Sequence, residues 1–230
     1  MKHGRLLFYL LFLKLLPAFP ALCMGVSGFL MLCSAMVPYM KTTAYFNELK
    51  QVFNANPLAI TDGFDYPVGA PDGKGYYNAQ KFQENYHLGE DWNGTGGGNT
   101  DLGDPVYAAA NGYVVFSAPH TAGWGNVVRI VHCTFPGNEK RKPVYLETLY
   151  AHLDTILVAS GDIVSRGQQI GTIGSSNGKY YAHLHFELRY NIMMLIGAGY
   201  GSRRGYLDPS RFINSHRKKI IRRAPDTGKK

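Results

Sequence analysis

The stretch "YYAHLHFEL" at residues 180–188 places two histidines one residue apart inside a run that otherwise looks like a buried β-strand. Side chains two residues apart on a strand point to the same face, about 7 Å from each other. His183, His185 and Glu187 therefore share one face, and the opposite face is apolar. We predict that the apolar face packs in the core and that the polar face lines an open groove. On its own, an H-x-H pattern favours two exposed strand histidines over a functional pair.

Short runs rich in Val, Ile and Tyr, separated by Gly, Asn, Asp and Pro, extend the strand pattern over residues 105–190. They include "PVYAAANGYVVFSA", "GNVVRIVH", "VYLETLYAHL" and "GDIVSRGQQIGTIG". Such runs are typical of strands and hairpins, and the region has no long helical period. We predict an all-β domain, an antiparallel β-sandwich or open barrel-like fold. A long glycine-rich loop is expected before it, over residues 77–105.

The N-terminus predicts export. Lys2 and Arg5 precede a long apolar segment, and residues 15–39 contain no charged side chain. This length is sufficient for a hydrophobic helix that spans a bilayer. Residues 1–40 are expected to be a signal peptide or a signal anchor, with the later residues outside the cytoplasm because the positive charges lie before the apolar segment. The protein would then be anchored or secreted, on the periplasmic or extracellular face of the cytoplasmic membrane.

The rest of the chain is expected to form a linker at 41–61, one domain at 62–213 and a basic tail at 214–230. Residues 211–230 contain eight Lys and Arg residues and one Asp, and so carry +7 of the formal net charge of +8. Because this charge lies in the tail, a basic face for nucleic acid is not predicted. The tail suits contact with anionic lipid or wall polymer, or a solvated end. The sequence does not specify the oligomeric state.

Further histidines suggest a metal site. The motif "HLGED" places His87 and Asp91 four residues apart, and "YAHL" places His152 at the end of another apolar run. Zinc accepts imidazole nitrogen and carboxylate oxygen, and catalytic zinc sites have three protein ligands and one open position. His87, Asp91 and His185 would supply such a set. His152 and His183 would remain as outer or catalytic imidazoles.

Several motifs occur together in one order. They are "HLGED" for H-x-x-x-D, "GDPVYAAANGYVVF" for G-x-x-V-x-A-x-x-G-x-V, "WGNVVRIVH" for G-N-x-V-x-I-x-H, then "YAHL", the block "GDIVSRGQQIGTIGSSNGKYYAHLHFEL" and a closing D-P in "LDPSRF". With these motifs the chain resembles the lysostaphin-type zinc metallopeptidases, also called LytM-domain peptidoglycan endopeptidases. The resemblance covers about residues 62–213.

The resemblance implies a role for each candidate residue. The family's metal ligands fall on His87, Asp91 and His185, which implies one Zn²⁺ per chain. Its two further active-site histidines fall on His152 and His183. The implied activity is hydrolysis of an amide bond in the stem or cross-bridge peptides of peptidoglycan, with two histidines assisting. The sequence does not specify which bond is cut or which histidine is the general base.

Two alternatives stay open. The domain could be a non-catalytic relative that binds and activates another cell-wall hydrolase, although silent relatives characteristically lose ligands and this chain retains all three. It could also be a latent enzyme whose groove is covered by residues 42–60.

The chain departs from the family pattern at a few positions. Glu90 stands where the family usually has an apolar residue, and we expect its side chain to point to solvent. Glu187 could orient a ligand histidine or be a solvated strand carboxylate. The loop at 93–102 and the apolar insert at 191–205 look longer than in compact relatives, and both are expected to shape the groove.

Overall fold

The computed structural model describes residues 42–135 and 142–217. The predicted leader at 1–40 and most of the basic tail lie outside the described residues. The described residues from 48 onward belong to one compact unit, whereas the described part of the other unit, residues 42–47, is the beginning of a helix that runs over 42–55. Within the described ranges, no helix is long and apolar enough to cross a membrane.

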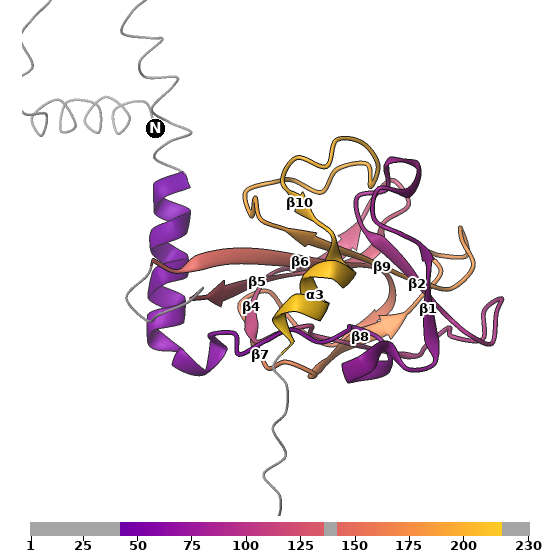
Figure 1. Ribbon diagram of the computed structural model, residues 1–230, viewed down its shortest axis with the longest axis horizontal. Coiled ribbons are helices and arrows are strands. Elements are labelled where there is room, and N and C mark those ends of the chain that lie inside the picture. Colours follow the sequence, from indigo (N-terminus) through magenta and orange to yellow (C-terminus); the bar gives the residue numbers. More distant parts are fainter. Residues whose placement is uncertain (1–41, 136–141, 218–230) are drawn as a thin grey trace, which may run out of the picture. The chain divides into compact units, whose positions relative to one another are not determined.

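The described part of the compact unit is built mainly from strands (Figure 1). Every ladder between two of these strands is antiparallel, which confirms the predicted all-β antiparallel class. Apart from the helix over 42–55, the helical elements are short: η1 (Pro57–Ala59), η2 (Gly69–Gly73), η3 (Glu84–Tyr86) and α3 (Pro209–His216). The strands are β1 (Tyr76–Gln80), β2 (Glu90–Gly94), β3 (Pro105–Tyr107), β4 (Gly112–His120), β5 (Gly125–Thr134), β6 (Val144–Ile156), β7 (Ile163–Val164), β8 (Gln169–Ile173), β9 (Leu184–Arg189) and β10 (Tyr206–Leu207).

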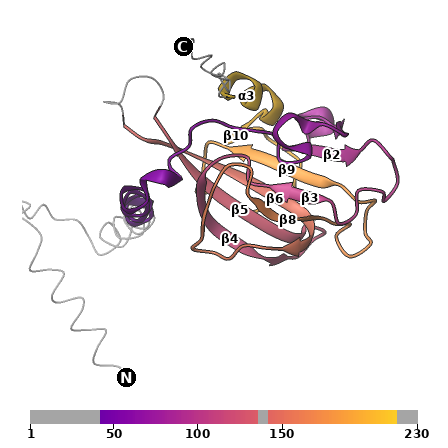
Figure 2. The ribbon, with the colours of Figure 1, turned by 90° about the horizontal axis from the view of Figure 1, so that it is seen from below.

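The long strand β6 organises the sheet, whose order is β1-β2-β9-β6-β5-β4-β7. One edge of β6 pairs first with β9, over residues 147–151, and then with β8, at Leu153 and Ile156. Strand β8 also pairs with β3, so these two strands branch from the main order. Figure 2 shows β8 and β3 beside β6 and the strongly curved strands β4 and β5.

The core lies between these strands. Val106 of β3 and Ile170 of β8 belong to the same buried cluster as Ile130 of β5. The predicted apolar face of β9 belongs to this cluster as well, which confirms that face as core: Leu184, Phe186 and Leu188 are at most 1% exposed. Burying one such side chain stabilises a fold by about 1.5–3 kcal/mol.

The segment predicted as a long loop, residues 77–105, instead contains β1 and β2, so this prediction was wrong. Its glycines and polar residues obscure the strand pattern. Strand β2 forms nevertheless because β9 pairs with it on one edge and β1 on the other, so that its backbone groups are satisfied by tertiary partners.

Residues 48–61 pack on the domain away from the candidate site. Leu49 and Phe53 are buried, and the Phe53 ring lies 5.9 Å from that of Tyr145 near the start of β6. His152 is seven residues further along the same strand, a separation of about 23 Å at strand rise. Nearby, Ile60 forms a bridge with Cys133, whose side chain is buried. These contacts give no support to a segment that covers the groove.

Helix α3 closes the fold beside β9 and β10 (Figure 1). Its start is well specified, since the side chain of Asp208 accepts a hydrogen bond from the Arg211 backbone N–H and Pro209 occupies the first helical turn. Ile213 is buried, and the Phe212 ring packs edge-on against Phe64 at 5.1 Å. The closing "LDPSRF" motif is therefore a helix start.

Candidate metal centre and catalytic cavity

Strand pairing brings the predicted ligands together. Asp91 on β2 lies directly opposite His185 on β9, and Ala151 on β6 lies opposite His185 on the other side. His87 precedes β2 and forms a bridge with Tyr200. The two halves of the predicted ligand set, distant in sequence, are thus cross-strand neighbours.

Three donor atoms converge at one point. Nε2 of His87 is 3.0 Å from Nδ1 of His185 and 3.4 Å from Oδ1 of Asp91, and the remaining separation, between Nδ1 of His185 and Oδ1 of Asp91, is 2.9 Å. Ligands of a tetrahedral zinc ion, with bonds of about 2.0–2.1 Å, lie about 3.3 Å apart. The residues present therefore fit a small divalent cation, with a fourth direction left for water or substrate.

Glu187 fixes the tautomer of His185. Oε1 of Glu187 lies 3.1 Å from Nε2 of His185, so Nε2–H donates to Glu187. Nδ1 is the nitrogen that faces Asp91 and His87, and it would bind a metal once its own proton is displaced. Burial lowers the pKa of His185, but hydrogen bonds and charge from the two flanking carboxylates outweigh it and raise the pKa to about 9. For Asp91 the directions are reversed: burial raises the pKa of the carboxyl group, but hydrogen bonds from the imidazoles of His185 and His87 lower that pKa well below the usual range. The centre thus favours a cation.

His87 is held differently. Its Nδ1 is buried and has no hydrogen-bond partner among the described residues. The ring packs instead against Tyr200, at 5.1 Å between centroids. Next to this segment, a Cβ on Gly89 would meet the Phe186 carbonyl oxygen at 2.6 Å, so glycine permits the close approach of this segment to β9.

A buried chain of alternating charges continues behind His185. Glu187 accepts from Nε of Arg189 at 2.7 Å, and Nη1 of Arg189 donates to Glu147 at 3.2 Å. Arg129 then binds Glu147 through two nitrogens, at 3.0 and 2.7 Å. Since Glu187 is fully buried, the polar face of β9 lines a cavity only at its histidine end, and the prediction of an open groove along the whole face was wrong.

We expect Glu147→Ala to destabilise the fold by about 3–5 kcal/mol, because Arg189 would be buried with one carboxylate partner fewer and Arg129 would lose the one carboxylate that it contacts among the described residues. Burial raises the pKa of Glu147 and the charge of Arg129 lowers it, so the carboxylate depends on its partners. Denaturant unfolding followed by circular dichroism measures the loss. The exposed carboxylate Glu48 gives the control, since Glu48→Ala should change stability by no more than about 0.5 kcal/mol. Equal effects of the two substitutions would contradict a stabilising role of the chain.

His152 and His183 adjoin the three donors. Their ring centroids are 4.7 Å apart, and Nε2 of His183 is 3.9 Å from Oδ1 of Asp91. In each ring Nδ1 faces a backbone carbonyl, that of Trp124 at 3.2 Å for His152 and that of Tyr181 at 2.8 Å for His183. A carbonyl oxygen can only accept, so Nδ1–H donates in both rings and Nε2 is left with its lone pair.

The backbone at His152 is unusual, with a φ of 61°, a conformation that is costly for residues other than glycine. Its N–H donates to the Trp124 carbonyl at 2.9 Å, which holds this conformation at the bend of β6. Burial, together with charge from His185 and His183, lowers the pKa of His152 to about 3. Its imidazole is therefore neutral at pH 7.

A cavity of about 270 Å³ is lined by all five predicted site residues. It is also lined by residues to which the sequence assigned no role, among them Gln80, Trp124, Tyr180 and Tyr200. The Trp124 indole N–H donates to the Gly197 carbonyl at 3.0 Å and so attaches the 191–205 insert to the cavity wall. One signal was available: Trp124 is one of only two tryptophans and stands between two glycines.

Glu90 does not point to solvent, and that prediction was wrong. It is 2% exposed and accepts hydrogen bonds from the Ser210 hydroxyl at 2.8 Å and the Trp92 indole at 3.2 Å. Alternation along β2 turns Glu90 away from the face that carries Asp91, toward α3. Its carboxylate therefore fastens α3 to β2 from the face of β2 opposite to Asp91.

Fold and cavity together define an antiparallel β protein with a His/Asp/His cluster of metal-binding type. The family model of peptidase family M23 matches residues 86–195. Lipoprotein NlpD of Yersinia enterocolitica is 41% identical over 88 residues, which cover 38% of this chain and 79% of that protein. The chain belongs to peptidase family M23.

Two further relatives carry different functional names. Peptidoglycan DD-endopeptidase ShyB of Vibrio cholerae is 33% identical over 147 residues, 62% of this chain and 29% of that protein. Murein hydrolase activator NlpD of Escherichia coli is 40% identical over 88 residues, 38% of this chain and 20% of that protein. The chain therefore matches less than a third of the length of these two relatives.

Proposed function

We propose that this protein is a zinc-dependent endopeptidase that hydrolyses an amide bond in the stem or cross-bridge peptides of peptidoglycan. The observation that carries the proposal is the convergence of Nε2 of His87, Oδ1 of Asp91 and Nδ1 of His185 within 3.4 Å of one another. One zinc ion held by these atoms supplies Lewis acidity, polarising a carbonyl group and lowering the pKa of water.

His152 and His183 would handle protons in this cavity. Each keeps Nδ1–H on a backbone carbonyl, so each presents Nε2 as an acceptor to a water molecule. Once protonated, the same nitrogen can donate to the leaving amine or to the developing oxyanion. Nε2 of His183 lies 3.9 Å from Oδ1 of Asp91, so it would lie beside a water molecule bound at the metal site. We therefore assign the general base to His183, whereas the neutral His152 would accept a hydrogen bond from water or substrate through Nε2.

We further propose that the protein acts in the cell envelope outside the cytoplasmic membrane, because its substrate lies there and the apolar N-terminal segment predicts export. Membrane association through that segment is part of this proposal.

A second candidate function is activation of another murein hydrolase, favoured by the name of the Escherichia coli relative. The complete donor set counts against it, since a purely regulatory domain has no need to keep three convergent donors. The same experiment separates the two functions.

We expect purified peptidoglycan sacculi incubated with the full chain to release defined muropeptides, identified by mass spectrometry. A zinc chelator should stop the release, and added zinc should restore it, because the proposed hydrolysis needs the zinc ion as its Lewis acid. Product masses would identify the bond that is cut. A folded, zinc-loaded protein that releases nothing by itself but accelerates release by an added murein hydrolase would refute the endopeptidase and establish the activator.

A further inference from the structure

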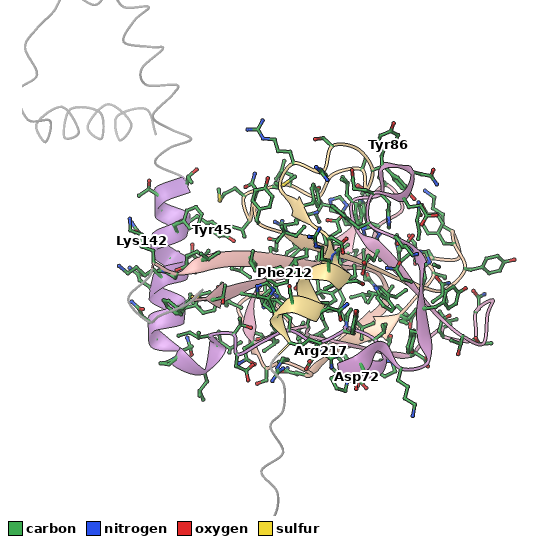
Figure 3. All side chains as sticks on the ribbon, viewed as in Figure 1. Tyr45, Asp72, Tyr86, Lys142, Phe212 and Arg217 are labelled. Atoms are coloured by element: carbon green, nitrogen blue, oxygen red, sulfur yellow. The ribbon has the colours of Figure 1, made fainter. Side chains whose placement is uncertain are left out.

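A second and larger groove, of about 770 Å³, lies beside α3 and β10. Figure 1 shows these two elements next to each other, and Figure 3 labels Phe212 on α3. Aromatic and cationic side chains line the groove together: Phe82, Tyr190, Arg203, Arg204, Arg211 and Phe212. None of these residues belongs to the candidate metal centre.

The arginines of this groove differ from the other arginines that the structure describes. Arg129, Arg166, Arg189 and Arg217 all form ion pairs with carboxylates. Arg203, Arg204 and Arg211 are exposed and form no ion pair within the described ranges. Asp208 is the carboxylate of the groove, and it caps α3. The unpaired guanidinium groups are thus gathered in one place, where they outnumber the carboxylate.

The groove begins next to the catalytic cavity. The Tyr200 hydroxyl donates to Gln80 at 3.1 Å, and both residues line the cavity. Phe82 and Ser202, each two residues further along the chain, line the groove. Two residues of extended backbone span at most about 7 Å. A polymer bound in the cavity can therefore continue past the Gln80–Tyr200 contact into the groove.

We propose that this groove binds the free carboxylates of peptidoglycan stem peptides on the segment that adjoins the bond being cut. Guanidinium groups bind carboxylates with paired hydrogen bonds, and an exposed ring such as Tyr190, 52% exposed, offers a surface for the apolar faces of the polymer. This inference rests on the proposed peptidoglycan substrate, and it concerns binding alone.

The test is co-sedimentation of the full chain with purified sacculi at 4 °C. We expect Arg203→Gln combined with Arg204→Gln to weaken binding about tenfold, as the loss of charge-assisted hydrogen bonds predicts. The matched control, Lys74→Gln with Lys142→Gln, removes the same charge from exposed positions outside the groove and should bind like the wild type. Lys142 lies well away from Phe212 in Figure 3. Arg211→Gln tests the groove from α3 and should weaken binding in the same direction.

Chemical amidation of the sacculus carboxylates completes the experiment. It should lower wild-type binding to the level of the arginine variant and leave that variant almost unchanged, because both changes remove the same contact. Equal losses in the arginine and lysine variants, or unchanged binding in both, would overturn the inference. So would a loss seen on phosphatidylglycerol vesicles but not on sacculi. A protein that binds through the groove yet releases no muropeptide would refute the proposed hydrolysis and leave this inference standing.

Discussion

His185→Ala should abolish zinc binding and, with it, muropeptide release. The substitution removes the donor that lies 3.0 Å from His87 and 2.9 Å from Asp91, so two ligands remain and the buried Glu187 loses its imidazole partner. Loss of a residue that hydrogen-bonds to a metal ligand already lowers metal affinity about 10–100-fold, and loss of a ligand itself should lower the affinity further. Metal analysis of purified protein, by inductively coupled plasma mass spectrometry, measures the zinc content per chain.

The control for this experiment is His120→Ala, which removes a histidine at the end of β4 that is not among the three converging donors. It should keep one zinc per chain. Because His185 is buried, thermal unfolding must first show that the His185→Ala chain is folded. A folded variant that still binds one zinc with unchanged affinity would show that the ligand assignment is wrong.

His183→Ala should retain zinc and lose turnover by about 10²–10⁴-fold, the contribution of a positioned general base. Nε2 of His183 lies 3.9 Å from Asp91, farther than the ligand nitrogen of His185, and its side chain remains partly exposed. Removing the ring therefore takes away the proton acceptor without disturbing the three donors. Muropeptide release under single-turnover conditions and zinc content should be measured on the same preparation.

Asn at this position offers a sharper comparison, since His183→Asn keeps a polar group that can donate to the Tyr181 carbonyl but cannot act as a base. It should be as inactive as the alanine variant and equally zinc-loaded. Loss of zinc in both variants would move His183 into the ligand set, and full activity in either would exclude it as the base.

Alternation within "HLHFEL" was enough to predict which residues of β9 enter the core, and Leu184 and Phe186 lie there. The same two-residue period could have indicated the charged chain, because Arg189 follows Glu187 at the next alternate position. What the local sequence could not supply was the neighbour of His185. Asp91 reaches it only through β2, whose glycine-rich surroundings resemble a loop and whose strand conformation depends on pairing with β9.

The error at Glu90 has a similar cause. A carboxylate next to a predicted ligand is normally expected in water. Glu90 is buried because Ser210, 120 residues later, donates two hydrogen bonds to it from the start of α3. The 191–205 insert was expected to shape the groove, and its Tyr200 lines the cavity. The contact of the insert with Trp124 could not be predicted, since these segments meet only after the insert has folded back on the domain.

That insert has a consequence for how the protein could diversify. Its Tyr200 lines the cavity at the candidate metal centre, and Arg203 and Arg204, only a few residues later, line the second groove. A single insertion or deletion between residues 191 and 205 would therefore alter both surfaces together. The charged chain behind His185 lies on β5, β6 and β9, and its Arg129 donates to the Met194 carbonyl of the insert at 2.9 Å. Exchange of this one segment between family members would thus change residues that line the cavity and the groove, while His87, Asp91 and His185 stay the same.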